Sequence, residues 1–350
     1  MTELLEVTMA RITPVDRAAI AAAQRDFDAK TKPRGSLGRL EELACRLRAI
    51  RRGRPLGEAA IIVAAADHGV AAAGVSAYPA AVTAQMVANF AAGGAAINVL
   101  ARQAQARLIV VDAGVATAVD DESVRAFRIG AGTGDITRGP AMTATQVRQA
   151  IDAGIGLVGE LAEEGVGMVA VGEMGIGNTT VASVLAACLL GVEPELVCGR
   201  GTGVDDAGLE RKLAAIKRAL EVNQPDPADP LAVLAALGGF EIALLVGVML
   251  AAAASGVVVV LDGFITTAAA LVAVRLAAAS RDAMVAAHLS PEPGHRRILA
   301  ALDLDPLLDL GLRLGEASGA ALALPLIRSA AALLDEMATF DSAGVTDAGR

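Results

Sequence analysis

Residues 239–263 read GFEIALLVGVMLAAAASGVVVVLDG, and the interpretation of this stretch decides the fold. The run from Ile242 to Leu261 carries no charge and has the nominal length of a membrane-spanning helix. Its composition changes at Ser255-Gly256, however, from Ala/Leu-rich to almost purely β-branched. A change of this kind at a helix-breaking pair is typical of a buried helix, a turn and a buried strand. We therefore expect a core helix and a core strand here, and no membrane span.

Similar apolar runs recur along the chain and alternate with Ala-rich stretches. Runs that are apolar throughout are typical of parallel strands covered by helices on both faces. The expected strands are 59–66, 107–112, 166–172, 195–199, 256–262 and 283–288. The expected helices are 81–102, 144–163, 179–190, 206–221, 229–253, 265–278 and 317–337. This alternation predicts an α/β fold with a doubly wound, mostly parallel, Rossmann-like sheet.

The two ends of the chain are predicted to be mostly helical and to form a small lobe beside the sheet. Residues 1–57 would supply the N-terminal part of this lobe, and residues 292–350 the C-terminal part. Residues 58–291 would form the parallel-sheet domain with the nucleotide site.

Composition excludes several classes of protein. The net charge is −9, and aromatic residues make up 2% of the chain, which argues against a nucleic-acid-binding surface. The three cysteines contain no CxxC pair, and the acidic N-terminal stretch does not resemble a signal peptide, so we expect a cytoplasmic protein with reduced thiols. The three histidines form no HxxxH pattern, so the sequence predicts no metal site and no bound cofactor.

Small clusters of polar residues and glycine follow nearly every expected strand. In an open parallel sheet the carboxyl ends of the strands lie at one edge, where ligands bind. The sequence therefore predicts one active site built from six segments: 67–69, 112–114, 172–180, 199–206, 262–264 and 288–290.

Two of these segments are glycine-rich loops that each precede an expected helix. GEMGIGNTT (172–180) has neither the Lys-Ser/Thr of a P-loop nor the spacing of a dinucleotide-binding loop, and it could be a tight structural turn. GRGTGVDD (199–206) is followed by Lys212, which taken alone is interpreted more simply as a solvated surface lysine. Together, the two loops and the lysine favour a single phosphate held mainly by backbone N–H groups, as in a mononucleotide.

Two glutamates are candidates for acid–base chemistry. Glu173 and Glu316 each lie beside glycine in a largely apolar segment, where burial can raise the pKa of a carboxyl group toward neutrality. The alternative for Glu316 is a simpler role at the N-terminus of the next helix, where the helix dipole stabilises a negative charge.

These motifs belong to a series of blocks that covers nearly the whole chain. Through them the sequence resembles the nicotinate-nucleotide:dimethylbenzimidazole phosphoribosyltransferases. The blocks are KPRGSLGRLE (32–41), DHGVAAAGVSAYPAAVTAQMVANF (67–90), GTGDITRGPAMT (132–143), GEMGIGNTT (172–180), GRGTGVDD (199–206), LGGFEIA (237–243), LDGFITTAAA (261–270), AHLSPEPGH (287–295) and LRLGEASGAALALPL (312–326).

The resemblance implies a metal-free transfer, in a homodimer, of phosphoribose from nicotinate mononucleotide to 5,6-dimethylbenzimidazole. It implies that Glu316 is the general base and Glu173 a second important carboxylate. The implied ligands of the mononucleotide are Gly175, Gly177, Asn178, Thr179, Thr180, Gly201, Gly203, Lys212, Asp262, Gly263 and Ser290. The implied lining of the benzimidazole pocket is Tyr78, Gln85, Met86, Met174 and Leu314.

One residue departs from the family pattern. Members of the family usually have glycine after the catalytic glutamate, whereas this chain has Ala317. If that position needs a positive φ or clears space for the base, the alanine methyl group would shift or narrow the pocket. The alternatives are therefore transfer to another acceptor, such as adenine or a phenol, and a non-catalytic nucleotide-binding protein with the same fold.

Overall fold

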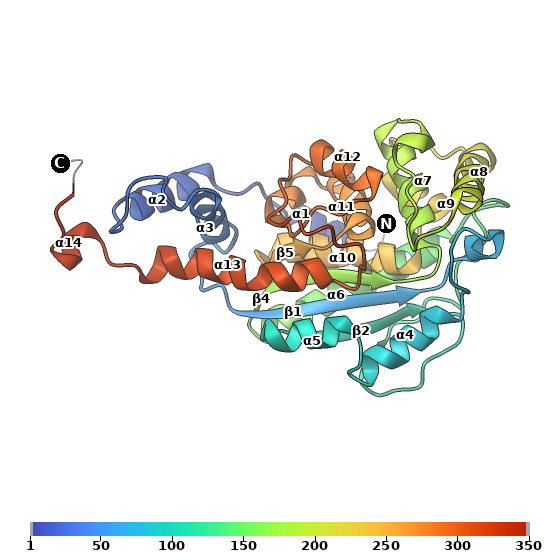
Figure 1. The fold of residues 1–350 in the computed structure, drawn as a ribbon, viewed down its shortest axis with the longest axis horizontal. Coiled ribbons are helices and arrows are strands. Elements are labelled where there is room, and N and C mark those ends of the chain that lie inside the picture. The colour runs from blue at the N-terminus through green and yellow to red at the C-terminus, as the bar shows by residue number, and fades with distance from the viewer. Residues whose placement is uncertain (1–2, 348–350) are drawn as a thin grey trace.

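The computed structural model describes residues 3–347, and it has the α/β fold that the sequence predicts (Figure 1). Its sheet contains six strands, and every neighbouring pair is parallel. They are β1 (Glu58–Ala66), β2 (Arg107–Gly114), β3 (Val124–Ala126), β4 (Val166–Met174), β5 (Val258–Leu261) and β6 (Met284–Ala286). The order β3-β2-β1-β4-β5-β6 is doubly wound and changes direction between β1 and β4, where such folds bind their ligands.

Helices cover both faces of the sheet because its strands are apolar on both sides. Along β1, Ile62 and Ala64 point into one hydrophobic cluster, and Ile61 and Val63 point into the other. The first face is covered by α1 (Glu3–Ala10), α6 (Ala144–Glu163), α7 (Asn178–Leu190), α8 (Asp206–Asn223), α9 (Pro230–Leu237), α10 (Phe240–Ser255), α11 (Phe264–Leu276) and α12 (Pro293–Ala301). The second face is covered by α2 (Arg17–Asp28), α3 (Arg39–Ile50), α4 (Val82–Ala91), α5 (Ala96–Gln103) and α13 (Ser318–Glu336).

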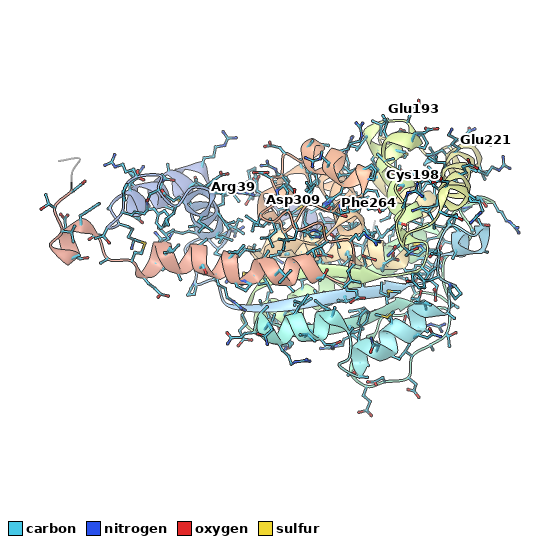
Figure 2. The ribbon with its side chains drawn as sticks, viewed as in Figure 1. Arg39, Glu193, Cys198, Glu221, Phe264 and Asp309 are labelled. Atoms are coloured by element: carbon cyan, nitrogen blue, oxygen red, sulfur yellow. The ribbon has the colours of Figure 1, made fainter. Side chains whose placement is uncertain are left out.

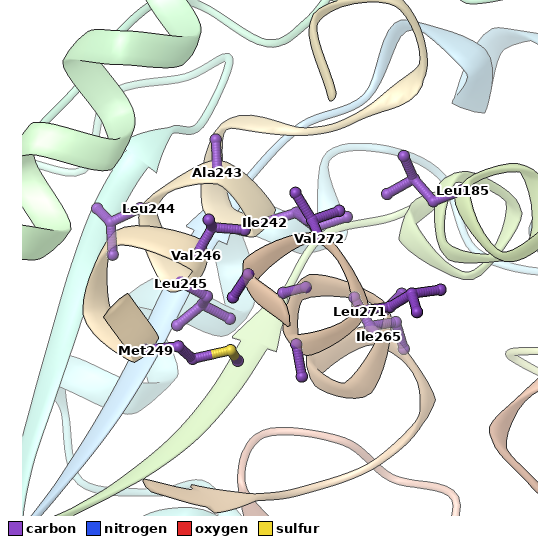
Figure 3. Packing of buried hydrophobic residues seen from close by; sticks show 14 of the residues in the cluster. Leu185, Ile242, Ala243, Leu244, Leu245, Val246, Met249, Ile265, Leu271 and Val272 are labelled. Carbon is purple, nitrogen blue, oxygen red and sulfur yellow. The ribbon is translucent and has the colours of Figure 1, made fainter. Parts of the chain in front are cut away.

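The uncharged stretch 242–261 is a core helix followed by a core strand, as predicted. Nearly all of α10 is buried, and it packs against α6 and α11 (Figure 3). Gly154 of α6 and Gly247 of α10 permit this close approach, because a Cβ atom at either position would overlap the backbone of the other helix. After the turn at Gly256, β5 pairs with β4 on one side and with the edge strand β6 on the other.

Both ends of the chain contribute to a helical lobe that extends from the main body as an arm (Figure 1). In it α13 packs against α3 and α2, and α14 (Phe340–Ala343) follows α13 near the tip. Helix α1 does not join the arm, because it packs on α6 and α10 of the main body. The boundaries at 57/58 and 291/292 stay predictions, and residues 1–2 and 348–350 of the terminal ranges lie outside the described residues.

The structure differs from the predicted elements at four places. The predicted strand 195–199 is wrong, because Pro194–Leu196 forms a short 3₁₀-helix and glycines follow it. The predicted helix 81–102 is two helices divided at Gly93-Gly94, and 229–253 is two helices divided at Gly238-Gly239. The short edge strand β3 was not predicted, since it lies in a mostly polar segment.

By length and composition alone, two helical stretches could cross a membrane: 82–103 and 318–336. The first is divided into α4 and α5, and half of the second is buried inside the protein. Core helices pass the same test, so these stretches are weak evidence for a membrane span.

Candidate active site

A cavity opens beyond the carboxyl ends of β4 and β5, at the edge of the sheet where the site was predicted. It is covered on one side by residues 313–315, which precede α13. Nine of the predicted site residues line it: Glu173, Met174, Gly175, Asn178, Thr179, Gly201, Gly263, Ser290 and Leu314. The cavity also contains residues that the sequence analysis did not single out: Ile176, Thr202, Phe264, Ile265, His288, Glu292, Arg313 and Gly315.

The glycine-rich loop after β4 presents the start of a helix to this cavity. Gly177 has a φ of +99°, a conformation that favours glycine, and it leads directly into α7. No side chain caps α7, and the N–H groups of Asn178 and Thr180 donate to the carbonyl oxygens of Gly175 and Gly177, which leaves the N–H of Thr179 for an anion. Gly177 packs against His68, and Thr180 is fully buried, so neither residue lines the cavity.

Lys212 joins the two glycine-rich loops, and its interpretation as a surface lysine is wrong. The side chain is fully buried, although it lies on α8 outside the sheet. Its Nζ donates to Thr179 Oγ1 at 3.0 Å and to the carbonyl oxygen of Gly199 at 2.9 Å. Burial lowers the pKa of this ammonium group, because its hydrogen-bond partners are neutral. The lysine is therefore a cation held beside the cavity without a carboxylate bound to it.

The second glycine-rich loop is placed by Glu292. The N–H of Gly201 donates to Glu292 Oε1 at 2.9 Å, and Gly201 lies close to the Lys212 ammonium group. Gly203 lies further out, beside Arg313, and does not line the cavity. The loop thus reaches the predicted site although no strand precedes it. Cys198, which precedes the loop, is buried, whereas Figure 2 shows Glu193 and Glu221 at the periphery of the molecule near α7 and α8.

Glu173, at the end of β4, is buried in the wall of the cavity. Burial raises the pKa of its carboxyl group well above the usual range, and the nearby carboxylates Glu241, Asp262 and Glu316 raise it further. The side-chain amide of Asn178 donates to Glu173 and partly opposes this effect. Burial and the neighbouring carboxylates therefore both favour the protonated form of Glu173.

Glu316 directly follows the lining residues Leu314 and Gly315. Burial raises the pKa of its carboxyl group to about 7, and the backbone N–H of Ile97 at the start of α5 partly opposes the shift. Its Oε2 is buried without a hydrogen-bond partner. A carboxylate with this pKa and a free oxygen suits a general base at neutral pH.

The backbone around Glu316 has two consecutive residues with positive φ: +60° at Glu316 and +64° at Ala317. This conformation explains the glycine that the family pattern has at position 317. The Ala317 methyl group points away from the cavity and is buried against Gly172 of β4. The alanine therefore strains the backbone but does not narrow the cavity.

We expect Gly172→Ala to disrupt this part of the site. A Cβ atom at position 172 would lie 2.6 Å from Ala317 Cβ and would also overlap the backbone of residues 316 and 317. The loop would have to move, and a displacement of about 1 Å can lower catalysis on the order of 10²-fold. Steady-state assays should show this fall in kcat, and a Gly172→Ala variant with unchanged kcat would contradict the packing. Gly156→Ala is a suitable control, because space is open at that position on α6.

The residues predicted for the base pocket are only partly brought together. Met174 and Leu314 line the cavity, whereas Tyr78 is 55% exposed. On α4, Gln85 is exposed and Met86 is half-buried. Their segment nevertheless borders the cavity. Thr83 accepts a hydrogen bond from the N–H of Ile176, and Ser76 contacts Thr202.

Asp262 does not line the cavity, although it was predicted to bind the mononucleotide. It is 1% exposed, and it accepts hydrogen bonds from the backbone at the start of α13. Its neighbour Gly263 and the more distant Ser290 do line the cavity.

A buried His68–Glu241 pair was missed by the sequence analysis. His68 Nε2 lies 2.9 Å from Glu241 Oε1, directly beneath the glycine-rich loop at Gly175. Both residues lie in quoted motifs, DHG and LGGFEIA, but nothing in the sequence showed that these motifs would meet.

A hollow of about 320 Å³ adjoins the candidate cavity and shares Ser290 and Glu292 with it. Three larger ones, of about 410–490 Å³, lie beside α3 at the base of the arm and contain none of the predicted site residues. One is lined by the paired charges Arg39–Asp305 and Arg281–Asp303. Within residues 3–347, no group of three His, Cys, Asp or Glu side chains is arranged to hold a metal ion.

Comparisons with known proteins show the family to which the chain belongs. A family model described as phosphoribosyltransferase matches residues 12–345. The nicotinate-nucleotide–dimethylbenzimidazole phosphoribosyltransferase of Roseiflexus sp. (strain RS-1) is 54% identical, with 98% of each chain covered. The enzyme of the same name from Desulforudis audaxviator is 52% identical, with 99% of each chain covered.

A solved structure shows the same fold at high sequence identity. The crystal structure of the nicotinate-nucleotide–dimethylbenzimidazole phosphoribosyltransferase from Thermus thermophilus superposes with a TM-score of 0.89 at 47% identity. The superposition covers 95% of this chain and 99% of that one. The chain therefore belongs to the nicotinate-nucleotide–dimethylbenzimidazole phosphoribosyltransferase family, and it is a phosphoribosyltransferase that acts on small molecules.

Proposed function

We propose that this enzyme transfers phosphoribose from nicotinate mononucleotide to 5,6-dimethylbenzimidazole, giving α-ribazole 5′-phosphate and nicotinate. The observation that carries the proposal is the buried Glu316 carboxylate, with a pKa of about 7 and an unpartnered oxygen, next to the cavity-lining residues 313–315. The names of the relatives supply the two substrates.

The phosphate of the mononucleotide would lie at the start of α7. The N–H of Thr179 would donate to it, and Lys212 would supply the positive charge. Gly201 and Thr179, which line the cavity beside Lys212, would complete this subsite.

The reaction needs one proton acceptor. A ring nitrogen of the benzimidazole attacks the anomeric carbon of the ribose, and the bond from this carbon to the pyridinium nitrogen breaks. The bonding electron pair stays on nicotinate, which leaves as a neutral ring without needing a proton. The attacking ring must lose the proton from its other nitrogen, and Glu316 would accept it. A base of this kind contributes about 10²–10⁴-fold to the rate.

Glu173 would act as a second carboxyl group in the wall of the cavity, near Glu316, which follows the lining residue Gly315. Because burial raises the pKa of Glu173 well above the usual range, its protonated form is favoured, and a protonated carboxyl group could donate a hydrogen bond to a substrate. We also propose that the enzyme works as a homodimer in the cytoplasm. The exposed Leu322 and Leu326 on α13 are consistent with a partner surface.

Purified protein mixed with nicotinate mononucleotide and 5,6-dimethylbenzimidazole, without added metal, tests the proposal. We expect equal amounts of nicotinate and α-ribazole 5′-phosphate, separated by chromatography. Parallel reactions with adenine and with a phenol test the alternative acceptors. Faster turnover with either would move the assignment to that acceptor, and tight nucleotide binding without turnover of any acceptor would favour a non-catalytic protein.

A further inference from the structure

Helix α13 begins directly after Glu316, and its own sequence does not cap it. The residue at its N-cap position is Ala317, whose side chain can accept no hydrogen bond. The first N–H groups of a helix need an acceptor when they are buried, and Asn, Asp, Ser or Thr usually supplies it from the N-cap position. In this helix the acceptor comes from another part of the chain.

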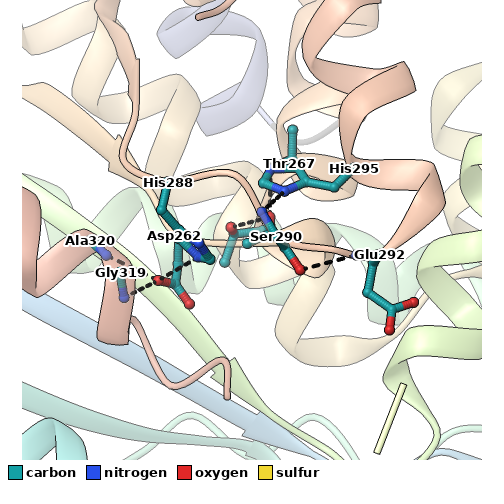
Figure 4. A network of polar contacts seen from close by, with 10 residues as sticks. Asp262, Thr267, His288, Ser290, Glu292, His295, Gly319 and Ala320 are labelled. Atoms are coloured by element: carbon teal, nitrogen blue, oxygen red, sulfur yellow. Dashed lines mark hydrogen bonds and ion pairs between the residues drawn. The ribbon is translucent and has the colours of Figure 1, made fainter. Parts of the chain in front are cut away.

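That acceptor is Asp262, at the carboxyl end of β5. Its Oδ1 accepts from the N–H of Gly319 at 2.7 Å and from the N–H of Ala320 at 3.0 Å (Figure 4). His288 contacts the same oxygen, with Nε2 at 3.6 Å. Asp262 thus ties the start of α13 to the sheet from 57 residues away.

The conformation that Asp262 stabilises is strained. Glu316 and Ala317 both have positive φ, which costs of order 1 kcal/mol or more for each non-glycine residue. Such a conformation persists only when its surroundings determine it. Gly172 of β4 packs against Ala317, and Asp262 accepts a hydrogen bond from Ala320 in the first turn of α13.

We infer that Asp262 is a positioning residue, which places the Glu316 carboxylate at the cavity by holding the first turn of α13. This inference rests on the proposed function, in which Glu316 is the base. It replaces the sequence-based expectation that Asp262 binds the mononucleotide. Asp262 is 1% exposed and its Oδ1 is bonded to the start of α13, so it would act on the reaction through Glu316, the residue directly before the N-cap.

Two variants of Asp262 and one control test the inference. Asp262→Ala removes the acceptor, whereas Asp262→Asn keeps an oxygen that can accept from both N–H groups. Asp229→Ala removes a comparable aspartate cap, which accepts from the N–H of Ala232 at the start of α9, away from the cavity. Should Asp262→Ala not fold, Asp262→Ser gives the same comparison, because its shorter side chain cannot satisfy both N–H groups.

We expect Asp262→Ala to lower kcat on the order of 10²-fold, while the calorimetric Kd for nicotinate mononucleotide changes by less than about threefold. The kcat of Asp262→Asn should be about tenfold higher than that of Asp262→Ala. Asp229→Ala should lower the melting temperature by a similar amount without changing kcat. Hydrogen exchange of the Gly319 and Ala320 amides should be faster in Asp262→Ala than in the wild type.

A weaker Kd for nicotinate mononucleotide with unchanged kcat in Asp262→Ala would overturn the inference and restore Asp262 as a substrate ligand. An equal fall of kcat in Asp229→Ala would reduce Asp262 to an ordinary helix cap. If the wild type does not turn over nicotinate mononucleotide, the proposed function fails, and amide exchange still decides the structural part. Unchanged hydrogen exchange of the Gly319 and Ala320 amides in Asp262→Ala would then also refute the role of Asp262 in holding the first turn of α13.

Discussion

Glu316→Gln is expected to lower kcat for phosphoribosyl transfer to 5,6-dimethylbenzimidazole by at least about 10²-fold. Glutamine has nearly the same shape as glutamate but cannot accept the proton that the attacking benzimidazole must lose. Since Glu316 is not among the groups proposed to bind the phosphate, the Kd for nicotinate mononucleotide should stay within about threefold of the wild-type value. Single-turnover assays with saturating substrates, together with calorimetric titration, separate the two effects.

The same substitution should make the protein more stable above neutral pH. The pKa of Glu316 is about 7 in the folded protein, compared with 4.5 for an ordinary glutamate. Between these two values the folded state holds a proton that the unfolded chain releases, so the free energy of unfolding falls as the pH rises from 4.5 to 7. The full shift corresponds to about 3 kcal/mol. Replacing the ionised carboxylate should therefore raise the melting temperature at pH 8 by about 2–4 °C.

The combination of lower kcat and higher melting temperature separates a catalytic defect from a folding defect. A variant that loses activity but melts at a higher temperature at pH 8 has not lost its activity by misfolding. The acid limb of the wild-type kcat profile should also have a midpoint near pH 7, because only the ionised carboxylate accepts a proton. Residual activity of Glu316→Gln should lack this limb. Survival of full activity in the variant would keep the reaction but exclude Glu316 as its base.

The main sheet could be predicted from the sequence because its strands are decided by local composition. The runs that became β1, β2, β4, β5 and β6 are apolar throughout, and glycine or polar residues end each of them. The false strand at 195–199 has the same apolar character at Val197-Cys198 but begins beside a proline. Helix divisions at glycine pairs were missed because apolar composition continues across them. Local pattern therefore predicts which segments are buried more reliably than where each element breaks.

The candidate site was predictable as a set of segments but not as a set of contacts. The order of parallel strands brings their carboxyl ends together, so the loop 172–180 could be assigned to one edge from the sequence. The loop 199–206 was assigned to the same edge from a strand that does not form. The burial of Lys212 could not be predicted, because it depends on two loops that close over one side chain. The contact of Asp262 with α13 joins residues far apart in the sequence, and no motif records it. Roles that depend on long-range packing therefore required coordinates.

Lys212→Met is expected to weaken binding of nicotinate mononucleotide by at least about tenfold and by up to about 10²-fold. The ammonium group is buried between Thr179 and Gly199, and a hydrogen bond from a charged group is worth about 1.5–3 kcal/mol. Methionine fills similar space without charge. Because the substitution also removes a desolvated cation with no carboxylate bound to it, the loss of its two hydrogen bonds should be partly offset, and the melting temperature should change little.

The decisive measurement compares melting temperatures with and without saturating inorganic phosphate. A ligand that binds only the folded state raises its stability in proportion to the logarithm of ligand concentration over Kd. The wild type should be stabilised by phosphate, and Lys212→Met should not be. Lys217→Met is the matched control, since this exposed lysine lies on the same helix and pairs with Glu195. Equal stabilisation of Lys212→Met and the wild type by phosphate would place the anion elsewhere and leave Lys212 as a structural link between the two glycine-rich loops.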